Sequence, residues 1–124
     1  MLIFQMSCQK EAAADTNGIS ATQLNKIIFF KGDNNVNGHI TGEIWTCNYD
    51  GSGAAKVNIT LPNGVYYSEN IIPVMSPNGQ KIFFTSGLDN NFNHADLYSC
   101  NSDGTSVTKI VDRGAGFIYM GGAY

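Results

Sequence analysis

The sequence predicts an all-β fold built from short antiparallel strands, and three observations lead to this prediction. The apolar residues gather in short runs, and no stretch keeps the 3.6-residue period of an amphipathic helix. Glycine is frequent, with 14 among 124 residues, and Asp-Gly and Asn-Gly pairs that favour hairpin turns separate the apolar runs. The third observation is an internal repeat with a period of about 53 residues.

The repeat is clearest in two pairs of segments. Residues 43–52 return as residues 96–105, 53 positions later, and residues 26–31 return as residues 80–85, 54 positions later. This period is longer than that of helical repeats and is close to that of a four-stranded propeller blade, about 40–50 residues. We therefore predict an all-β protein of about two four-stranded antiparallel β-propeller blades, which together form an incomplete, open propeller.

The individual strands follow from the apolar runs and from the turns between them. Residues 28–30 and 82–84 both read Ile-Phe-Phe, a continuous apolar run that is typical of a strand buried on both faces. Gly51 and Gly104 each follow an aspartate in a hairpin turn, where glycine readily takes a positive φ. The predicted strands lie near residues 19–24, 26–31, 43–48 and 55–60 in the first blade, near 70–75, 80–86, 95–100 and 107–112 in the second, and near 117–120 at the start of a third.

Two segments of the second repeat carry a family resemblance. Residues 73–86 read P-V-M-S-P-N-G-Q-K-I-F-F-T-S, and residues 96–105 read D-L-Y-S-C-N-S-D-G-T. Together they resemble the repeat of TolB-type β-propellers, with its Ser-Pro-Asp-Gly turn before one strand and its Asp-Gly-Ser/Thr turn after the next. Asn78 stands in place of the aspartate of the first turn, and Met75 in place of an aromatic residue, and both keep the turn or packing chemistry.

The resemblance covers residues 19–112 and implies a division of the chain. Residues 1–18 form a truncated lipoprotein signal and a disordered linker, 19–61 the first blade, 62–112 the second blade and 113–124 the start of a third. Two blades leave two broad apolar faces uncovered, because a closed propeller contains about 4–8 of them. The chain is then a fragment of a longer protein, assembles with copies of itself into a ring, or is marginally folded. The interrupted third blade favours a fragment.

The N-terminus resembles the end of a lipoprotein signal peptide. A short apolar stretch runs into Ser7-Cys8, and polar residues follow. Cys8 would then carry the lipid that anchors the protein in the periplasm or at the outer membrane, and this anchor would be the only membrane contact. An ordinary disordered N-terminus is the alternative.

The overall charge and the reactive side chains exclude several function classes. The net charge is −3 and the basic residues are scattered, which argues against nucleic-acid binding. His39 and His94 lie in predicted loops without a nearby cysteine, and Ser52 belongs to a hairpin turn rather than to a nucleophile elbow. We therefore expect no enzyme activity.

Two predicted loops between second and third strands carry the same D-x-N-x-N pattern. Alternating oxygen side chains resemble the start of a calcium loop. The candidate ligands are Asp33, Asn35 and Asn37 in the first loop and Asp89, Asn91 and Asn93 in the second. The alternative is a polar hairpin loop whose Asn and Asp side chains cap their own turns. No other cofactor is expected.

Cysteines and aromatic residues complete the set of candidate sites. Cys47 and Cys100 occupy equivalent strands of neighbouring sheets, about 10 Å apart, which exceeds the roughly 7 Å that a disulfide tolerates. We therefore predict two separate buried thiols. Trp45 and Tyr98 are also repeat-equivalent and predict a shared packing role. Tyr66 and Tyr67, in the connection between the blades, are the candidates for exposed partner contacts.

The family resemblance implies the function. TolB-like propellers present loops to protein or glycan partners, so the chain would be a non-enzymatic binding or scaffolding module of the bacterial cell envelope. The alternative is part of the propeller domain of a prolyl-oligopeptidase-type serine hydrolase, whose catalytic domain this sequence does not include.

Overall fold

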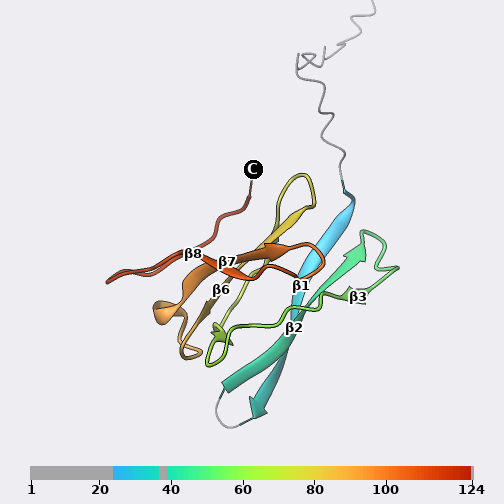
Figure 1. Ribbon diagram of the computed structural model, residues 1–124. Coiled ribbons are helices and arrows are strands. Elements are labelled where there is room, and N and C mark those ends of the chain that lie inside the picture. The colour runs from blue at the N-terminus through green and yellow to red at the C-terminus, as the bar shows by residue number, and fades with distance from the viewer. Residues whose placement is uncertain (1–23, 37–38, 124) are drawn as a thin grey trace, which may run out of the picture.

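The computed structural model describes residues 24–36 and 39–123, and in this part the chain is all-β apart from one turn of 3₁₀ helix, η1 (Phe92–His94) (Figure 1). The strands form two antiparallel sheets, and neither is closed. Three predicted features lie outside the described residues: the lipid-anchored Cys8, the strand near 19–24 and the calcium candidate Asn37.

The first sheet has three strands and the second has five. Strands β1 (Lys26–Val36), β2 (His39–Asn48) and β3 (Ala55–Lys56) follow one another in the first sheet, and β4 (Tyr66–Tyr67), β5 (Val74–Met75), β6 (Lys81–Gly87), β7 (Asp96–Asn101) and β8 (Thr108–Val111) make up the second. Strands β6, β7 and β8 form a meander, while β4 and β5 pair with the two ends of β6 along its other edge.

The β1–β2 hairpin is longer than predicted. The predicted loop around residues 33–37 is largely strand, since Asp33 pairs with Thr41 and the ladder continues to Val36 opposite His39. Only the two residues Asn37-Gly38 remain between the paired positions. This dipeptide favours a two-residue hairpin turn, so the strands can pair until they reach it.

Several other strands are shorter than predicted. Strand β3 ends at Lys56, although the N–H of Val57 still donates to the carbonyl of Ile44 in β2 at 2.8 Å, and the N–H of Ile59 then donates to the carbonyl of Val57 at 2.9 Å rather than to β2. The strand predicted near 70–75 is reduced to Val74–Met75, and residues 117–120 form no strand. Strand formation needs a hydrogen-bonded neighbour, and the described part of the chain offers residues 117–120 none.

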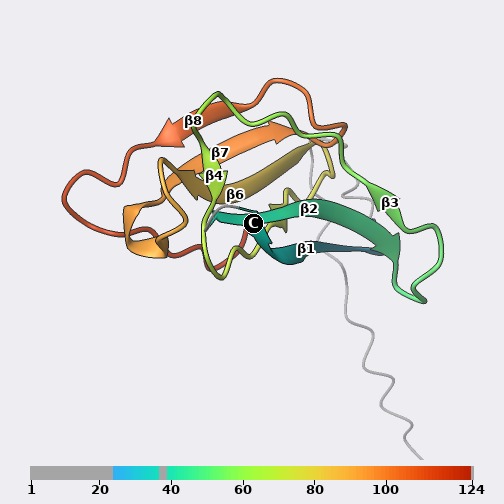
Figure 2. The ribbon, with the colours of Figure 1, turned by 90° about the horizontal axis from the view of Figure 1, so that it is seen from below.

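The two sheets lie one over the other, with β1 and β2 on one side and β6, β7 and β8 on the other (Figure 2). A row of aromatic rings fills the space between them. Phe30 meets Tyr67 edge to face at 5.1 Å, Tyr67 meets Phe84 at 5.7 Å, and Phe84 stacks on Tyr98 at 6.0 Å between ring centroids. Each such side chain, when fully buried, contributes about 1.5–3 kcal/mol relative to exposure.

The turns that follow β2 and β7 contain the same set of side-chain hydrogen bonds. An aspartate accepts from the N–H and the hydroxyl of a Ser or Thr, an asparagine donates to that hydroxyl, and a lysine of the preceding strand donates to the asparagine. The residues are Asp50, Ser52, Asn48 and Lys26 in the first sheet and Asp103, Thr105, Asn101 and Lys81 in the second. The matching distances agree to 0.1 Å.

These hydrogen bonds correct the alignment of β1 with β6. Lys26 lies opposite Asn48 as Lys81 lies opposite Asn101, so the equivalent positions are 55 residues apart rather than 54. Ile27, not Ile28, is therefore the equivalent of Ile82. A change of one residue matters because successive side chains of a strand point to opposite faces of the sheet.

Each sheet consequently has two distinct faces. The front face carries Ile27, Phe29 and Trp45 in the first sheet and Ile82, Phe84 and Tyr98 in the second. The back face carries Ile28, Phe30 and Ile44 in the first sheet and Phe83, Thr85 and Leu97 in the second. The core forms where the back face of the first sheet packs on the front face of the second. The sheets are therefore stacked front to back.

The shared packing role predicted for Trp45 and Tyr98 is wrong. Both lie on front faces, but only the front face of the second sheet is covered by another sheet, so Tyr98 is buried and Trp45 is half-buried. Nζ of Lys31 lies 4.3 Å from the centroid of the Trp45 ring, and the indole N–H donates to Glu43 at 2.9 Å. Trp45 thus faces outward with its polar edge satisfied.

Candidate functional site

A polar cleft of about 370 Å³ lies beside the loop of residues 88–94, at the end of the second sheet where β6 passes to β7. Its wall includes the main chain of the β6 end and side chains from the 88–94 loop, β7, β8 and the segment that follows β8. The charged residues around it are Asp89, His94, Asp96, Lys109, Asp112 and Arg113. Three aspartates and three basic side chains line the same cleft, so it presents both hydrogen-bond donors and acceptors to a ligand.

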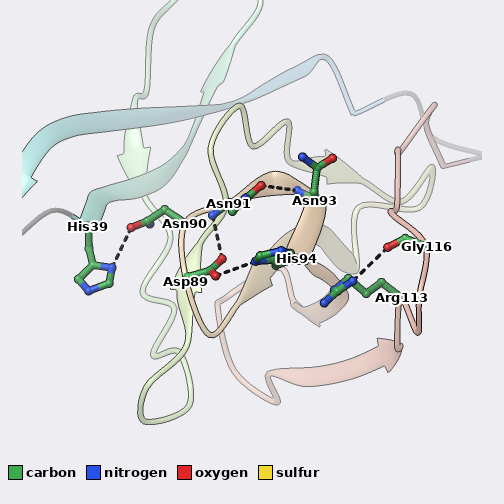
Figure 3. A network of polar contacts seen from close by, with 8 residues as sticks. All are labelled: His39, Asp89, Asn90, Asn91, Asn93, His94, Arg113 and Gly116. Atoms are coloured by element: carbon green, nitrogen blue, oxygen red, sulfur yellow. Dashed lines mark hydrogen bonds and ion pairs between the residues drawn. The ribbon is translucent and has the colours of Figure 1, made fainter.

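The 88–94 loop is held by its own side chains (Figure 3). Oδ1 of Asp89 accepts from the N–H of Asn91 at 3.0 Å, and Oδ1 of Asn91 accepts from the N–H of Asn93 at 3.0 Å. Oδ2 of Asp89 lies 2.8 Å from Nδ1 of His94, and this hydrogen bond is the main cause that lowers the pKa of Asp89. The side-chain oxygens of Asp89 and Asn91 therefore cap their own turns, which is the alternative that the sequence left open.

The far side of the cleft is a charged network on β7, β8 and the segment that follows β8. Nζ of Lys109 donates to Asp96 at 3.2 Å and to Asp112 at 2.9 Å, and these bonds raise the pKa of Lys109. The pKa of Asp112 is lowered, first by the N–H of Gly114 and then by Lys109. The guanidinium of Arg113 donates to the carbonyl of Gly116 at 3.2 Å (Figure 3). Exposed pairs of this kind contribute little to folding.

The loop is tied to the first sheet through Asn90. Nδ2 of Asn90 donates to the carbonyl of Tyr67 at 2.8 Å and to that of Ile40 at 3.2 Å, and Asn90 is 8% exposed. Oδ1 of Asn90 lies 2.9 Å from Nδ1 of His39 (Figure 3). The ring of His39 stacks on Tyr66 with centroids 4.0 Å apart. Because an amide oxygen only accepts, Nδ1 of His39 carries the proton. No sequence pattern marks Asn90 as a contact between the sheets, since its partners lie 23, 50 and 51 positions away.

The two histidines have different surroundings, and only His39 departs from the prediction. His39 was expected in a solvated loop, but it is the first residue of β2, is half-buried and bridges the two sheets. His94 is exposed, as expected, and faces the cleft. The reason is the length of the β1–β2 hairpin, which carries His39 beyond the predicted strand end and up to the second sheet.

The calcium candidates are not arranged as two equivalent loops. Asp33 and Asn35 lie within β1 and Asn37 lies outside the described residues, so the prediction of a first loop is wrong. Asp89, Asn91 and Asn93 do share one loop. Within residues 24–36 and 39–123, no three His, Cys, Asp or Glu side chains gather as a metal-ligand group. Calcium binding stays a prediction.

The remaining candidate residues are all buried or half-buried. Tyr67 is 8% exposed, and its burial raises the pKa of its hydroxyl to about 12, so the expectation that it lies on the surface is wrong. Tyr66 is half-buried against His39. Cys47 and Cys100 are two separate buried thiols, as predicted. Burial, and then Asp103, raises the pKa of the Cys100 thiol to about 11.

Compared with models of protein families, with curated proteins and with solved structures, the chain matches none of them. In the part of the chain that the structure describes, no helix combines the length and apolar character that crossing a bilayer requires. The structure thus defines an all-β protein of two open antiparallel sheets.

Proposed function

We propose that the chain is a non-enzymatic binding or scaffolding module of the bacterial cell envelope, built from two TolB-like propeller repeats. The observation that carries the proposal is the front-to-back stacking of two sheets with the same turn hydrogen bonds. Front-to-back stacking of equivalent sheets is the packing that propeller blades require. The resemblance of residues 73–86 and 96–105 to the TolB-type repeat supplies the link to the envelope.

The stacking brings the start of β2 next to the 88–94 loop. The hydrogen bond between His39, the first residue of β2, and Asn90 of the loop joins the two sheets here. Loops carried by a rigid sheet scaffold are the usual place for binding residues. The polar cleft lies at this end, next to the same loop.

The chemistry of the cleft suits a polar partner. Lys109 and Arg113 can donate to carboxylates or carbonyls, and His94 offers its Nε2 because its Nδ1 already bonds Asp89, while Asp89 and Asp112 can accept from hydroxyl or amide groups. Peptidoglycan fragments combine sugars with a short acidic peptide and therefore offer both kinds of group. We propose such a glycan-peptide, or a protein surface of similar chemistry, as the ligand.

Binding of purified muropeptides to the immobilised full chain tests the proposal. We expect saturable binding, weakened at least tenfold in a His94→Ala/Arg113→Ala variant, because both side chains face the cleft. Asn63→Ala, an exposed change in the connection between the sheets, is the matched control and should bind like the unmodified chain. If the chain binds no muropeptide, or if it hydrolyses the ligand or a peptide anilide, the proposed function is wrong.

A further inference from the structure

The back face of the second sheet lacks the partner that the back face of the first sheet has. In the first sheet, Ile44 is fully buried and Val57 is 7% exposed against the second sheet. Their equivalents 53 positions later are Leu97 and Ile110, and Ile110 is 46% exposed. A groove of about 360 Å³ runs over these residues and Phe83, and Met120, Gly122 and Ala123 of the C-terminal segment line part of it.

The front face of the first sheet lacks the partner that the front face of the second sheet has. Ile82 and Phe84 are fully buried beneath the first sheet. Their equivalents Ile27 and Phe29 lie on the outside of the first sheet next to Trp45, and Ile27 is 42% exposed. These two faces, which no sheet of the described residues covers, are therefore the two halves of an interface that the chain already forms once within itself.

The turn glycines show the same difference. A Cβ on Gly104 would overlap the carbonyl oxygen of Asn58, because the link that leaves the first sheet crosses this turn. A Cβ on its equivalent Gly51 would meet no atom within 4 Å. The segment at Asn58, which leaves the first sheet, thus packs against the Gly104 turn of the second sheet. The equivalent Gly51 turn of the first sheet has no such segment against it.

We propose that a second copy of this chain covers these faces, with the back face of its second sheet docked on the front face of the first sheet. The occupant follows from the internal interface, which already matches a back face with Ile44 and Val57 to a front face with Ile82 and Phe84. The proposal rests on the front-to-back repeat packing given under the proposed function. Because each copy uses two different faces, association continues until a ring of about 4–8 sheets closes, which corresponds to roughly two to four copies.

Two variants block one face each. Ile27→Asp places a charge on the front face of the first sheet, and Ile110→Asp places one on the back face of the second. Both positions are more than 40% exposed, so the single chain should still fold, which circular dichroism of each variant checks. By light scattering, the unmodified full chain is expected to have two to four times the mass of one chain, and each variant alone the mass of a single chain.

Mixing the two variants is the decisive measurement. The Ile110→Asp chain keeps its front face and the Ile27→Asp chain keeps its back face, so an equal mixture should form a dimer and grow no further. Trp45, the single tryptophan, lies on the docking face and should show a blue-shifted emission in the dimer. A dimer of either variant alone, a mixture that stays monomeric, or an unmodified chain that is monomeric would overturn the proposal.

The two proposals fail separately. A monomeric chain that still binds muropeptides through its cleft would exclude the second copy and leave the binding function in place. An assembled chain that binds no muropeptide would exclude the binding function and leave the docking of copies in place.

Discussion

Replacing Gly104 with alanine tests the contact between the sheets most directly. Gly104 has φ +89°, and an added Cβ would overlap the carbonyl oxygen of Asn58, 2.5 Å from its carbon and 3.0 Å from the nitrogen of Ile59. The change therefore carries two costs. An alanine in the left-handed region costs about 1–2 kcal/mol. Forcing an extra methyl group against backbone adds about 1–3 kcal/mol, as other overpacking changes do.

Gly51→Ala is the matched control, because it carries only the first of these costs. Gly51 occupies the same turn of the first sheet with φ +82°, and its added Cβ would meet nothing within 4 Å. We therefore expect Gly104→Ala to lose about 1–3 kcal/mol more of the free energy of unfolding than Gly51→Ala. For a unit of this size, each kcal/mol lowers Tm by about 4–8 °C.

Urea unfolding followed by circular dichroism, together with a thermal scan, gives both free energies when each change is made in the Ile27→Asp chain, which keeps the front face of the first sheet free of a second copy. Equal losses in the two variants would mean that the link at Asn58 does not cross the Gly104 turn, and the front-to-back stacking would then be wrong. A larger loss for Gly51→Ala would refute the reasoning as well, since the structure places no atom near that position.

Three further predictions concern the core, the thiols and the turns. Phe84→Ala removes a fully buried ring and should cost about 3–5 kcal/mol by urea unfolding, whereas Phe117→Ala, at a side chain 62% exposed, should change stability by about 0.5 kcal/mol or less. The Cys100 thiol, fully buried and with its pKa raised to about 11, should react with a thiol reagent at pH 8 only after unfolding, and a fast reaction of the folded chain would contradict its burial. Hydrogen bonds from Ser52 lower the pKa of Asp50 from 3.8, and hydrogen bonds from Thr105 lower that of Asp103 in the same way. The stability that these two aspartates contribute is therefore present above about pH 4 and is lost as the pH falls through the lowered pKa values. Tm should thus fall with acid, and less steeply in an Asp103→Asn variant.

The sequence predicts the strands that have clear boundaries and misses those that depend on a neighbour. Strands β6 and β7 were predicted to within one residue, since turn residues flank both of them. Strand β4 was missed because Tyr66 and Tyr67 pair with Ser86 and Gly87, a contact that no local pattern encodes. Their position in a Pro- and Gly-containing connection indicated a loop.

The register of β1 shows why an apolar run is ambiguous. Residues 27–30 read Ile-Ile-Phe-Phe, so alternation does not distinguish the front face from the back face. The residue types match as well when Ile28 is aligned with Ile82 as they do in the correct alignment of Ile27 with Ile82. The polar residues resolve it, because Lys26 and Lys81 each reach an asparagine across the strand pair.

The candidate site could be predicted only in part. The sequence located the 88–94 loop and its Asx turns, since these depend on residues two positions apart. The link between His39 and Asn90 spans 51 positions and depends on how the two sheets stack. The cleft also needs Lys109 and Arg113, which the meander brings beside the loop from the far end of the sheet.

The difference between the two faces of each sheet determines how the fold can grow. On strands β2 and β7 the front faces carry the aromatic Trp45 and Tyr98 and the back faces carry the aliphatic Ile44 and Leu97, while every face also carries one phenylalanine from β1 or β6. A symmetric pair would place a front face on a front face or a back face on a back face, whereas the interface within the chain places the back face of one sheet on the front face of the other. Adding further sheets front to back would repeat that interface. Every loop equivalent to the 88–94 loop would then lie on the same side of the assembly. Each added sheet therefore extends the surface on which the polar cleft lies, so assembly and binding depend on the same stacking.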